Sequence, residues 1–291
     1  MGIVGLSMEI LVAQSAGYCF GVRRAMEMVE KALGPKDQSL YSLGPLIHNP
    51  RVVDELGAKG LKTVDSLAQV PDGRVVIRSH GVGPGVYQRA LDQKLEIIDA
   101  TCPFVKNVQQ LAVFLRNEGY QVIIIGEPEH AEVKGVLDSV AGEALVIENA
   151  EGLKGCEIAP KVGVISQTTQ DIFNFQQVIN RIIPSVKEIR IYNTICLATS
   201  QRQQEVAELS RKVDLMIVVG GKNSANTSRL TEISLMNGTP THQIESAQEI
   251  DETWLQAIEK VGITAGASTP DQQIDEIIQK LICLGGNISN E

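Results

Sequence analysis

Three stretches of the chain repeat one order of apolar and polar segments. Each stretch begins with a short apolar run that leads to a cysteine, namely Cys19, Cys102 or Cys196. The residues after each cysteine have the apolar period of an amphipathic helix. Two further apolar runs follow in each stretch, and each of them ends in a polar turn. The pattern predicts strands that alternate with helices.

The polar turns recur at similar distances from the cysteines. The first turn lies about 28 residues after the cysteine in all three stretches, and the second lies about 60 to 72 residues after it. Units of this length predict parallel βαβ construction with right-handed crossovers. Ligands of such sheets bind beyond the carboxyl ends of the strands. If the three units surround a common axis, the three cysteines and six polar turns meet at one place.

A chain of 291 residues is too long for one ordinary core. We therefore expect an α/β fold of three similar small domains with parallel sheets in a pseudo-threefold arrangement, over residues 17–100, 101–194 and 195–285. The first two stretches end in a strand that leads to the next cysteine, whereas the third ends in a helix with no strand after it. The N-terminal segment 9–15 is therefore expected to complete the third sheet.

Composition excludes several classes of function. A net charge of -9 and an aromatic content of 4% argue against nucleic-acid binding, which needs clustered cations and stacking rings. No apolar run reaches the length of a membrane span, and the N-terminus lacks an export signal. Five scattered cysteines do not form a disulfide framework, so we expect a reducing cytoplasm. Met8 could be the natural start, which would make residues 1–7 an extension.

Recurrence favours a functional role for the three repeated cysteines, while Cys156 and Cys283 are interpreted as small buried apolar residues. Three thiolates could hold an iron–sulfur cluster in which one iron lacks a protein ligand and can engage a substrate. Structural zinc normally takes four ligands with close pairs, which are missing here. A catalytic zinc with three thiolates remains open, as does a nucleophilic cysteine with a histidine, which would account for only one cysteine.

Three of the four histidines, His48, His80 and His130, fall at repeated turns, and His242 falls outside them. The other turns carry hydroxyl and amide side chains: Thr168, Ser224, Asn226 and Ser268. Such residues at helix starts suit an anion with many acceptor oxygens, because helix N-termini offer unpaired N–H groups and a positive dipole end. Ordinary helix capping is the alternative, particularly for Thr169, Asn226 and Ser268.

Glu132 follows His130 by two residues. Taken alone, a glutamate at the start of a helix is usually a solvated residue that the helix dipole favours. Beside a metal centre in a closed pocket, its pKa would be raised and it could donate a proton. The residues alone favour the first interpretation.

Eight segments in order along the chain resemble the motifs of the LytB/IspH family, the 4-hydroxy-3-methylbut-2-enyl diphosphate reductases. They are AGYCFGVRRA, LGPLIHNPRVV, RSHGV, IDATCP, EHAEVKG, SQTT, GGKNSANTSRL and TAGAST. The resemblance runs from about Ala13 to Pro270. It departs from the family at Ala131, where members commonly have proline, and at Ala225, where many have a second serine.

The resemblance implies the terminal step of the non-mevalonate isoprenoid pathway, in which an allylic alcohol diphosphate gives isopentenyl and dimethylallyl diphosphates. It implies a central [4Fe–4S] cluster with three cysteine ligands and one open iron that binds the substrate hydroxyl. The implied ligands are Cys19, Cys102 and Cys196, and the implied diphosphate-binding residues are His48, His80, His130, Ser224, Asn226 and Ser268. Glu132 would deliver protons, and Thr168 would orient the leaving hydroxyl.

The family also implies an electron-donor protein of the flavodoxin or ferredoxin type, and no nucleic-acid or membrane partner. An iron–sulfur electron carrier and a zinc hydrolase of phosphorylated substrates remain as alternatives. A carrier would need four cysteines and no polar pocket, so the histidines and Glu132 count against it.

Overall fold

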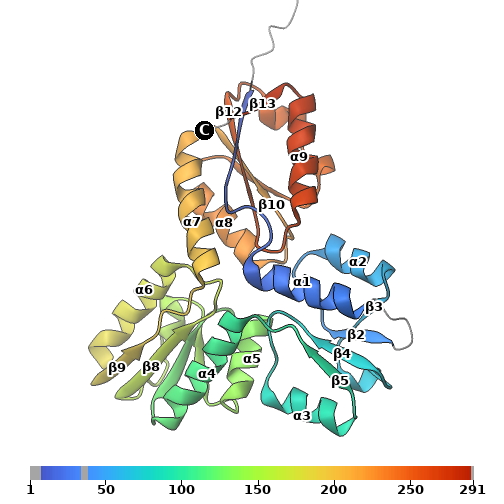
Figure 1. Cartoon of the computed structure of the whole chain (residues 1–291). Coiled ribbons are helices and arrows are strands. Elements are labelled where there is room, and N and C mark those ends of the chain that lie inside the picture. The colour runs from blue at the N-terminus through green and yellow to red at the C-terminus, as the bar shows by residue number, and fades with distance from the viewer. Residues whose placement is uncertain (1–7, 34–38, 290–291) are drawn as a thin grey trace, which may run out of the picture. The chain divides into compact units, whose positions relative to one another are not determined.

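The computed structural model describes residues 8–33 and 39–289, which form three parallel sheets (Figure 1). The choice between Met1 and Met8 as the start concerns residues 1–7, which lie outside the described ones. The chain divides into two compact units. Unit 1 comprises the described residues of 1–19 with 48–50 and 197–291, and unit 2 comprises 20–47 and 51–196. The predicted α/β fold with parallel sheets is confirmed, and the division into three domains stays a prediction.

Unit 1 contains a five-stranded sheet with the strand order β11-β10-β12-β1-β13. Its strands are β1 (Met8–Val12), β10 (Leu215–Val219), β11 (Thr241–Ile244), β12 (Lys260–Ala265) and β13 (Gly286–Ile288). Its helices are α7 (Leu197–Leu209), α8 (Ala225–Met236) and α9 (Asp271–Cys283), with 3-10 turns at η4 (Ser210–Lys212), η5 (Ala247–Glu249) and η6 (Glu252–Leu255). Helices α7 and α8 cover one face of the sheet, and α9 covers the other (Figure 1).

The N-terminal strand β1 lies in the sheet of the third stretch, where it pairs in parallel with β12. On its other side β1 pairs in parallel with β13. The expectation that no strand follows the last helix was therefore wrong. The three-residue β13 has a sequence, GNI, that carries no apolar run, so the sequence pattern gave no sign of a strand there.

Unit 2 contains two four-stranded sheets, with the orders β3-β2-β4-β5 and β7-β6-β8-β9. The strands of the first are β2 (Leu40–Leu43), β3 (Leu61–Val64), β4 (Arg74–Ile77) and β5 (Glu96–Asp99). The strands of the second are β6 (Gln121–Ile125), β7 (Ala144–Ile147), β8 (Lys161–Ser166) and β9 (Glu188–Ile191). The helices are α1 (Phe20–Ala32), α2 (Pro50–Ala58, apart from its first residue), α3 (Pro84–Asp92), α4 (Pro103–Asn117), α5 (Ala131–Ser139) and α6 (Ile172–Ile182). The 3-10 turns are η1 (Leu67–Gln69), η2 (Ala150–Leu153) and η3 (Ile183–Ser185).

Central strands are apolar on both faces because helices cover each sheet from both sides. In β6, Ile124 packs into a core with α4 and α5, while its neighbours Ile123 and Ile125 pack into a core with α6. Every residue of β10 is buried for the same reason. Among the helices of the described residues, none is both long and apolar enough to cross a bilayer.

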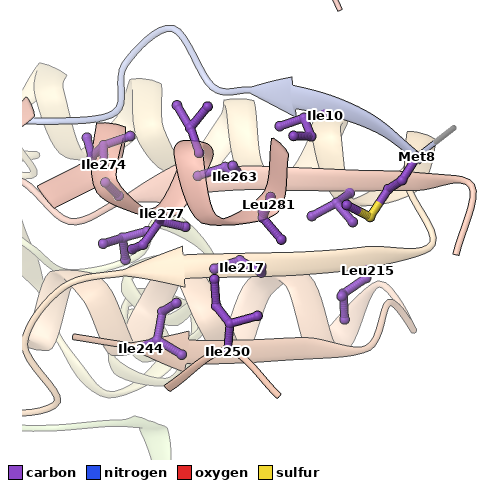
Figure 2. Packing of buried hydrophobic residues seen from close by; sticks show 14 residues of the cluster. Met8, Ile10, Leu215, Ile217, Ile244, Ile250, Ile263, Ile274, Ile277 and Leu281 are labelled. Atoms are coloured by element: carbon purple, nitrogen blue, oxygen red, sulfur yellow. The ribbon is translucent and has the colours of Figure 1, made fainter. Parts of the chain in front are cut away.

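The core on the α9 side of unit 1 joins the N-terminal strand to the C-terminal helix. Ile10 of β1, Ile217 of β10 and Ile263 of β12 belong to one buried cluster with Ile277 and Leu281 of α9 (Figure 2). Ile10 is 0% exposed. Burial of this side chain therefore ties the start of the chain to its last helix.

Replacement of Ile10 by alanine should lower the free energy of unfolding by about 2–5 kcal/mol, because it removes buried apolar atoms and leaves a cavity. The measurement is the urea midpoint of the protein without bound ligands. The matched control is Ile288→Ala in β13, where the isoleucine is 48% exposed and little should change. Equal midpoints for the two variants would contradict the assignment of β1 to this core.

Candidate active site

The three recurring cysteines make the same backbone hydrogen bond. Each donates its N–H group to a carbonyl group in the second polar turn of a stretch, and each directly precedes a helix. The bonds run from Cys19 to Ala267 at 3.1 Å, from Cys102 to Ser79 at 2.9 Å and from Cys196 to Thr168 at 3.0 Å. The first bond lies within unit 1 and the other two lie within unit 2. These bonds fix each of the three recurring cysteines beside the carboxyl end of a strand.

The environment of these cysteines suits an anionic sulfur. Cys19, Cys102 and Cys196 are all partly exposed, and the positive dipole end of the helix that follows stabilises negative charge. Cys156 is partly buried and packs against the apolar core beside α6, in line with its interpretation as a small apolar residue. The same interpretation was wrong for Cys283, which ends α9 with its side chain exposed.

Glu132, in the first turn of α5, is a buried carboxyl group that is only 2% exposed. Its Oε1 accepts a hydrogen bond from the N–H of Thr168 at 2.7 Å, and its Oε2 accepts one from the Thr168 hydroxyl at 2.7 Å. Burial raises the pKa of Glu132 to about 7, although both hydrogen bonds act to lower it. The interpretation as a solvated glutamate was therefore wrong.

His130 and His80 of unit 2 form a pair of imidazoles near the start of α5. Nδ1 of His130 accepts a hydrogen bond from the N–H of Glu132 at 3.2 Å and so caps α5. This bond assigns the proton of a neutral His130 ring to Nε2, which becomes a donor. The rings of His80 and His130 meet edge to face, with centroids 5.6 Å apart. Ala131, in the place of the expected proline, is the first residue of α5.

In unit 1 the segment 48–50 lies against two polar turns. The hydroxyl of Ser268 donates to the carbonyl of His48 at 3.0 Å, and Nδ2 of Asn49 donates to the carbonyl of Ser268 at 3.0 Å. Asn49 also donates to Oε1 of Gln273 at 3.0 Å. A Cβ atom on Gly221 would lie 2.7 Å from the carbonyl oxygen of His48, so only glycine permits this approach. Side-chain and backbone contacts thus hold His48 in place.

Sequence reasoning missed Asn49 and Gln273. Both side chains are 2% exposed. The available signal in the sequence was Asn49, a polar residue directly after His48 in an otherwise apolar run. The capping alternative was wrong for Ser268, whose hydroxyl binds the His48 carbonyl. It was also wrong for Thr169, because Asp171 caps α6 instead.

Ser224 and Asn226 begin helix α8. Ser224 is its cap, because its Oγ accepts a hydrogen bond from the N–H of Thr227 at 3.3 Å. Asn226 is 5% exposed, and among the described residues neither Nδ2 nor Oδ1 of its amide has a hydrogen-bond partner. Buried polar groups are normally paired, so this amide is suited to a ligand. Ala225, the first residue of α8, offers no hydroxyl in place of the second serine.

The predicted site residues fall in both units. Unit 2 holds Cys102, Cys196, His80, His130, Glu132 and Thr168. Unit 1 holds Cys19, His48, Ser224, Asn226 and Ser268. His242 lies in β11 and stacks on Trp254 with ring centroids 3.6 Å apart.

The sequence pattern of the LytB protein family matches residues 10–282, which include every predicted site residue. The chain belongs to the LytB family. Its similarity to curated LytB relatives is high along most of the chain. The 4-hydroxy-3-methylbut-2-enyl diphosphate reductase of Geobacter metallireducens is 45% identical over 94% of this chain and 97% of that protein. The reductase of the same name from Trichlorobacter lovleyi is 44% identical over 94% of this chain and 98% of that protein.

Solved structures of LytB reductases have the same fold. That of the E-1-hydroxy-2-methyl-but-2-enyl-4-diphosphate reductase from Plasmodium falciparum matches with a TM-score of 0.92 at 26% identity, over 98% of this chain and 93% of that one. That of (E)-4-hydroxy-3-methyl-but-2-enyl diphosphate reductase, described as the terminal enzyme of the non-mevalonate pathway, matches with a TM-score of 0.70 at 40% identity, over 94% and 99%. The resemblance carried by the eight motifs is therefore confirmed.

The stability of this LytB chain should depend on the ionisation of Glu132. Its pKa is raised from 4.5 to about 7 in the folded chain, so the folded state holds the proton more tightly. The contribution of Glu132 to the free energy of unfolding is therefore largest below pH 4.5 and falls as the pH rises through about 7. Relative to Glu132→Gln, the wild type should lose roughly 3 kcal/mol between these limits.

The measurement is the unfolding free energy of both proteins without bound ligands, from pH 5 to pH 8. Glu129→Gln is the matched control, because Glu129 is exposed and its pKa is lowered by Lys134. Its stability curve should run parallel to that of the wild type. A curve for Glu132→Gln that also ran parallel would contradict the raised pKa.

Proposed function

We propose that Glu132 delivers protons, that Thr168 orients the leaving hydroxyl, and that the polar turns bind the diphosphate, in the reductive removal of the hydroxyl group of 4-hydroxy-3-methylbut-2-enyl diphosphate. The activity follows from the family: the chain is a 4-hydroxy-3-methylbut-2-enyl diphosphate reductase, an oxidoreductase of the terminal step of the non-mevalonate pathway. Two electrons and two protons convert the substrate into isopentenyl or dimethylallyl diphosphate and water. The buried Glu132–Thr168 pair is the observation that carries the assignment of residues.

Cys19, Cys102 and Cys196 would hold a [4Fe–4S] cluster with one iron left open. The residues fit this group, because they are three partly exposed thiols with the same backbone hydrogen bond at the start of a helix. Thiolates are the usual protein ligands of iron–sulfur clusters. When bound, the cluster supplies the electrons and a Lewis-acidic iron for the substrate's hydroxyl oxygen, which no side chain can provide.

The diphosphate would be bound by donors of the polar turns. Asn226 offers a buried amide that gains a partner when an anion binds, and His130 offers its Nε2–H group. His48, His80, Ser224 and Ser268 would complete the set. The chain has a net charge of -9, so local donors of this kind must hold the anion. An anchored diphosphate fixes the position of the hydroxyl group and lowers the entropic part of the barrier.

Glu132 acts as the general acid of this reaction. With a pKa of about 7, the carboxyl group is protonated in about half of the molecules at neutral pH. The proton moves to the substrate's hydroxyl oxygen, which leaves as water, and the ionised carboxylate is then stabilised by both donors of Thr168. A simple electron carrier would have no use for such a pair.

The reaction needs an external electron source, and we assign this role to a small donor protein of the flavodoxin or ferredoxin type. The three cysteines must remain reduced to hold a cluster, so a reducing cytoplasm is the compartment that fits them. Anaerobically purified protein should contain iron and sulfide and turn over the allylic diphosphate with reduced viologen. Colourless protein with bound zinc and no such turnover would overturn the proposed function.

Glu132→Gln should lower turnover by roughly 10²- to 10⁴-fold, because glutamine cannot donate the proton. Iron content and the KM for the allylic diphosphate should stay close to those of the wild type. Turnover is followed anaerobically by the oxidation of reduced methyl viologen. Glu129→Gln should turn over normally, whereas Cys102→Ser should lose iron and activity together. Near-normal turnover in Glu132→Gln would remove Glu132 from its assigned role.

Asn226→Leu should raise the KM for the substrate by about 10- to 100-fold, since it removes a donor to a charged group. It should also stabilise the protein without ligand, because it removes a buried amide that has no partner among the described residues. The control is Asn237→Leu, whose amide donates to Ala207 and to Ser210. That variant should lose stability at an unchanged KM. An unchanged KM in Asn226→Leu would show that Asn226 does not bind substrate.

A further inference from the structure

Arg202 of α7 holds the backbone that leads to Cys19. Its Nη2 donates a hydrogen bond to the carbonyl of Gly17 at 2.7 Å, two residues before the cysteine. Its Nη1 donates to the carbonyl of Ala198 at 3.0 Å, which fixes the guanidinium against its own helix. Arg202 is only 4% exposed. All of these contacts lie within unit 1, so they place a buried positive charge beside the Cys19 segment.

Arg24 of α1 makes the corresponding contact beside Cys102, within unit 2. Its Nη1 donates to the carbonyl of Thr101 at 3.2 Å, directly before the cysteine. The N–H of Thr101 donates in turn to Oδ1 of Asp99 at 3.0 Å. Side chains thus hold Thr101 at both its N–H and its carbonyl group. Arg24 is half-buried.

The two arginines hold equivalent parts of the repeat. Each lies on the helix that follows one recurring cysteine and donates to a carbonyl group shortly before another. Arg24 follows Cys19 and contacts the segment before Cys102. Arg202 follows Cys196 and contacts the segment before Cys19. The third cysteine segment has the counterpart of the Asp99 contact, because Oδ1 of Asn193 accepts from the N–H of Ile195 at 3.2 Å. The recurrence shows that the backbone before each cysteine is fixed by side chains.

The guanidinium of each arginine stays positively charged. Thiolates that hold an iron–sulfur cluster carry negative charge, which increases when the cluster accepts an electron. Positive charge close to the backbone of the ligands therefore favours the reduced cluster and raises its reduction potential. A fixed main chain also limits the movement of a ligand away from its iron.

We propose that Arg24 and Arg202 are positioning residues that fix Cys102 and Cys19 as cluster ligands and raise the reduction potential of the cluster. This inference rests on the proposed function, because it requires these cysteines to hold the cluster. It assigns two separable effects to each arginine. The positive charge acts on the potential, and the hydrogen bond acts on the retention of iron.

The test compares Arg24→Gln and Arg202→Gln with the lysine variants at the same positions, all purified anaerobically with the cluster bound. The midpoint potential is measured in a redox titration monitored by electron paramagnetic resonance. Iron release is followed with a ferrous chelator. The glutamine variants should have more negative potentials and release iron about 10-fold faster. The lysine variants should keep most of the potential but release iron faster, because lysine retains the charge without the planar donor geometry.

Arg23→Gln and Arg211→Gln are the matched controls, since both arginines are exposed and belong to the same two helical segments, α1 and α7–η4. They should match the wild type in both measurements. If Arg202→Gln fails to fold, the half-buried Arg24 still provides the test. Wild-type potential and iron release in the Arg24 variants, with or without reduced stability of the protein without cluster, would overturn the inference. Wild-type protein that binds no cluster would instead overturn the proposed function.

Discussion

A hydrogen bond between a cysteine N–H group and a carbonyl group at the end of a neighbouring strand occurs three times in the described part of this protein. A parallel sheet brings the ends of adjacent strands together. The bond therefore fixes the position of the residue that directly precedes the next helix. Cys19, Cys102 and Cys196 are therefore placed by the sheets themselves and not by flexible loops. The arginine contacts of Arg24 and Arg202 reinforce a geometry that the backbone already determines.

Burial and hydrogen bonding have opposite effects on the pKa of Glu132. Its two hydrogen bonds from Thr168 favour the ionised form, but loss of solvent has the larger effect and holds the proton near neutral pH. Asn226 also lowers the stability of the folded chain, because its buried amide has no hydrogen-bond partner among the described residues. Both groups reduce the stability of the protein without ligand, which is typical of residues that serve a bound substrate.

The sequence predicted the parallel α/β fold because the central strands are continuous apolar runs, as in β10, and because helices such as α1 have a regular apolar period. It also predicted that the recurring cysteines and the polar turns lie at the ends of strands, because they stand at fixed places in that order. The environment of Glu132 could not be predicted from its position in the sequence, because its hydrogen-bond partner Thr168 follows a different strand. Asn49 and Gln273 were missed for the same reason, since they meet only in the folded chain. The limits of the three domains remain a prediction.

The position of β1 between β12 and β13 has a consequence for synthesis of the chain. Strand β1 is synthesised long before both of its neighbours, which begin at Lys260 and Gly286. Ile10 must therefore wait, without its native core, until the strand Lys260–Ala265 and helix α9 have emerged. Unit 2 has no such delay, because all of its sequence precedes residue 197. We expect it to be complete on the ribosome while the N-terminal strand is still without its sheet.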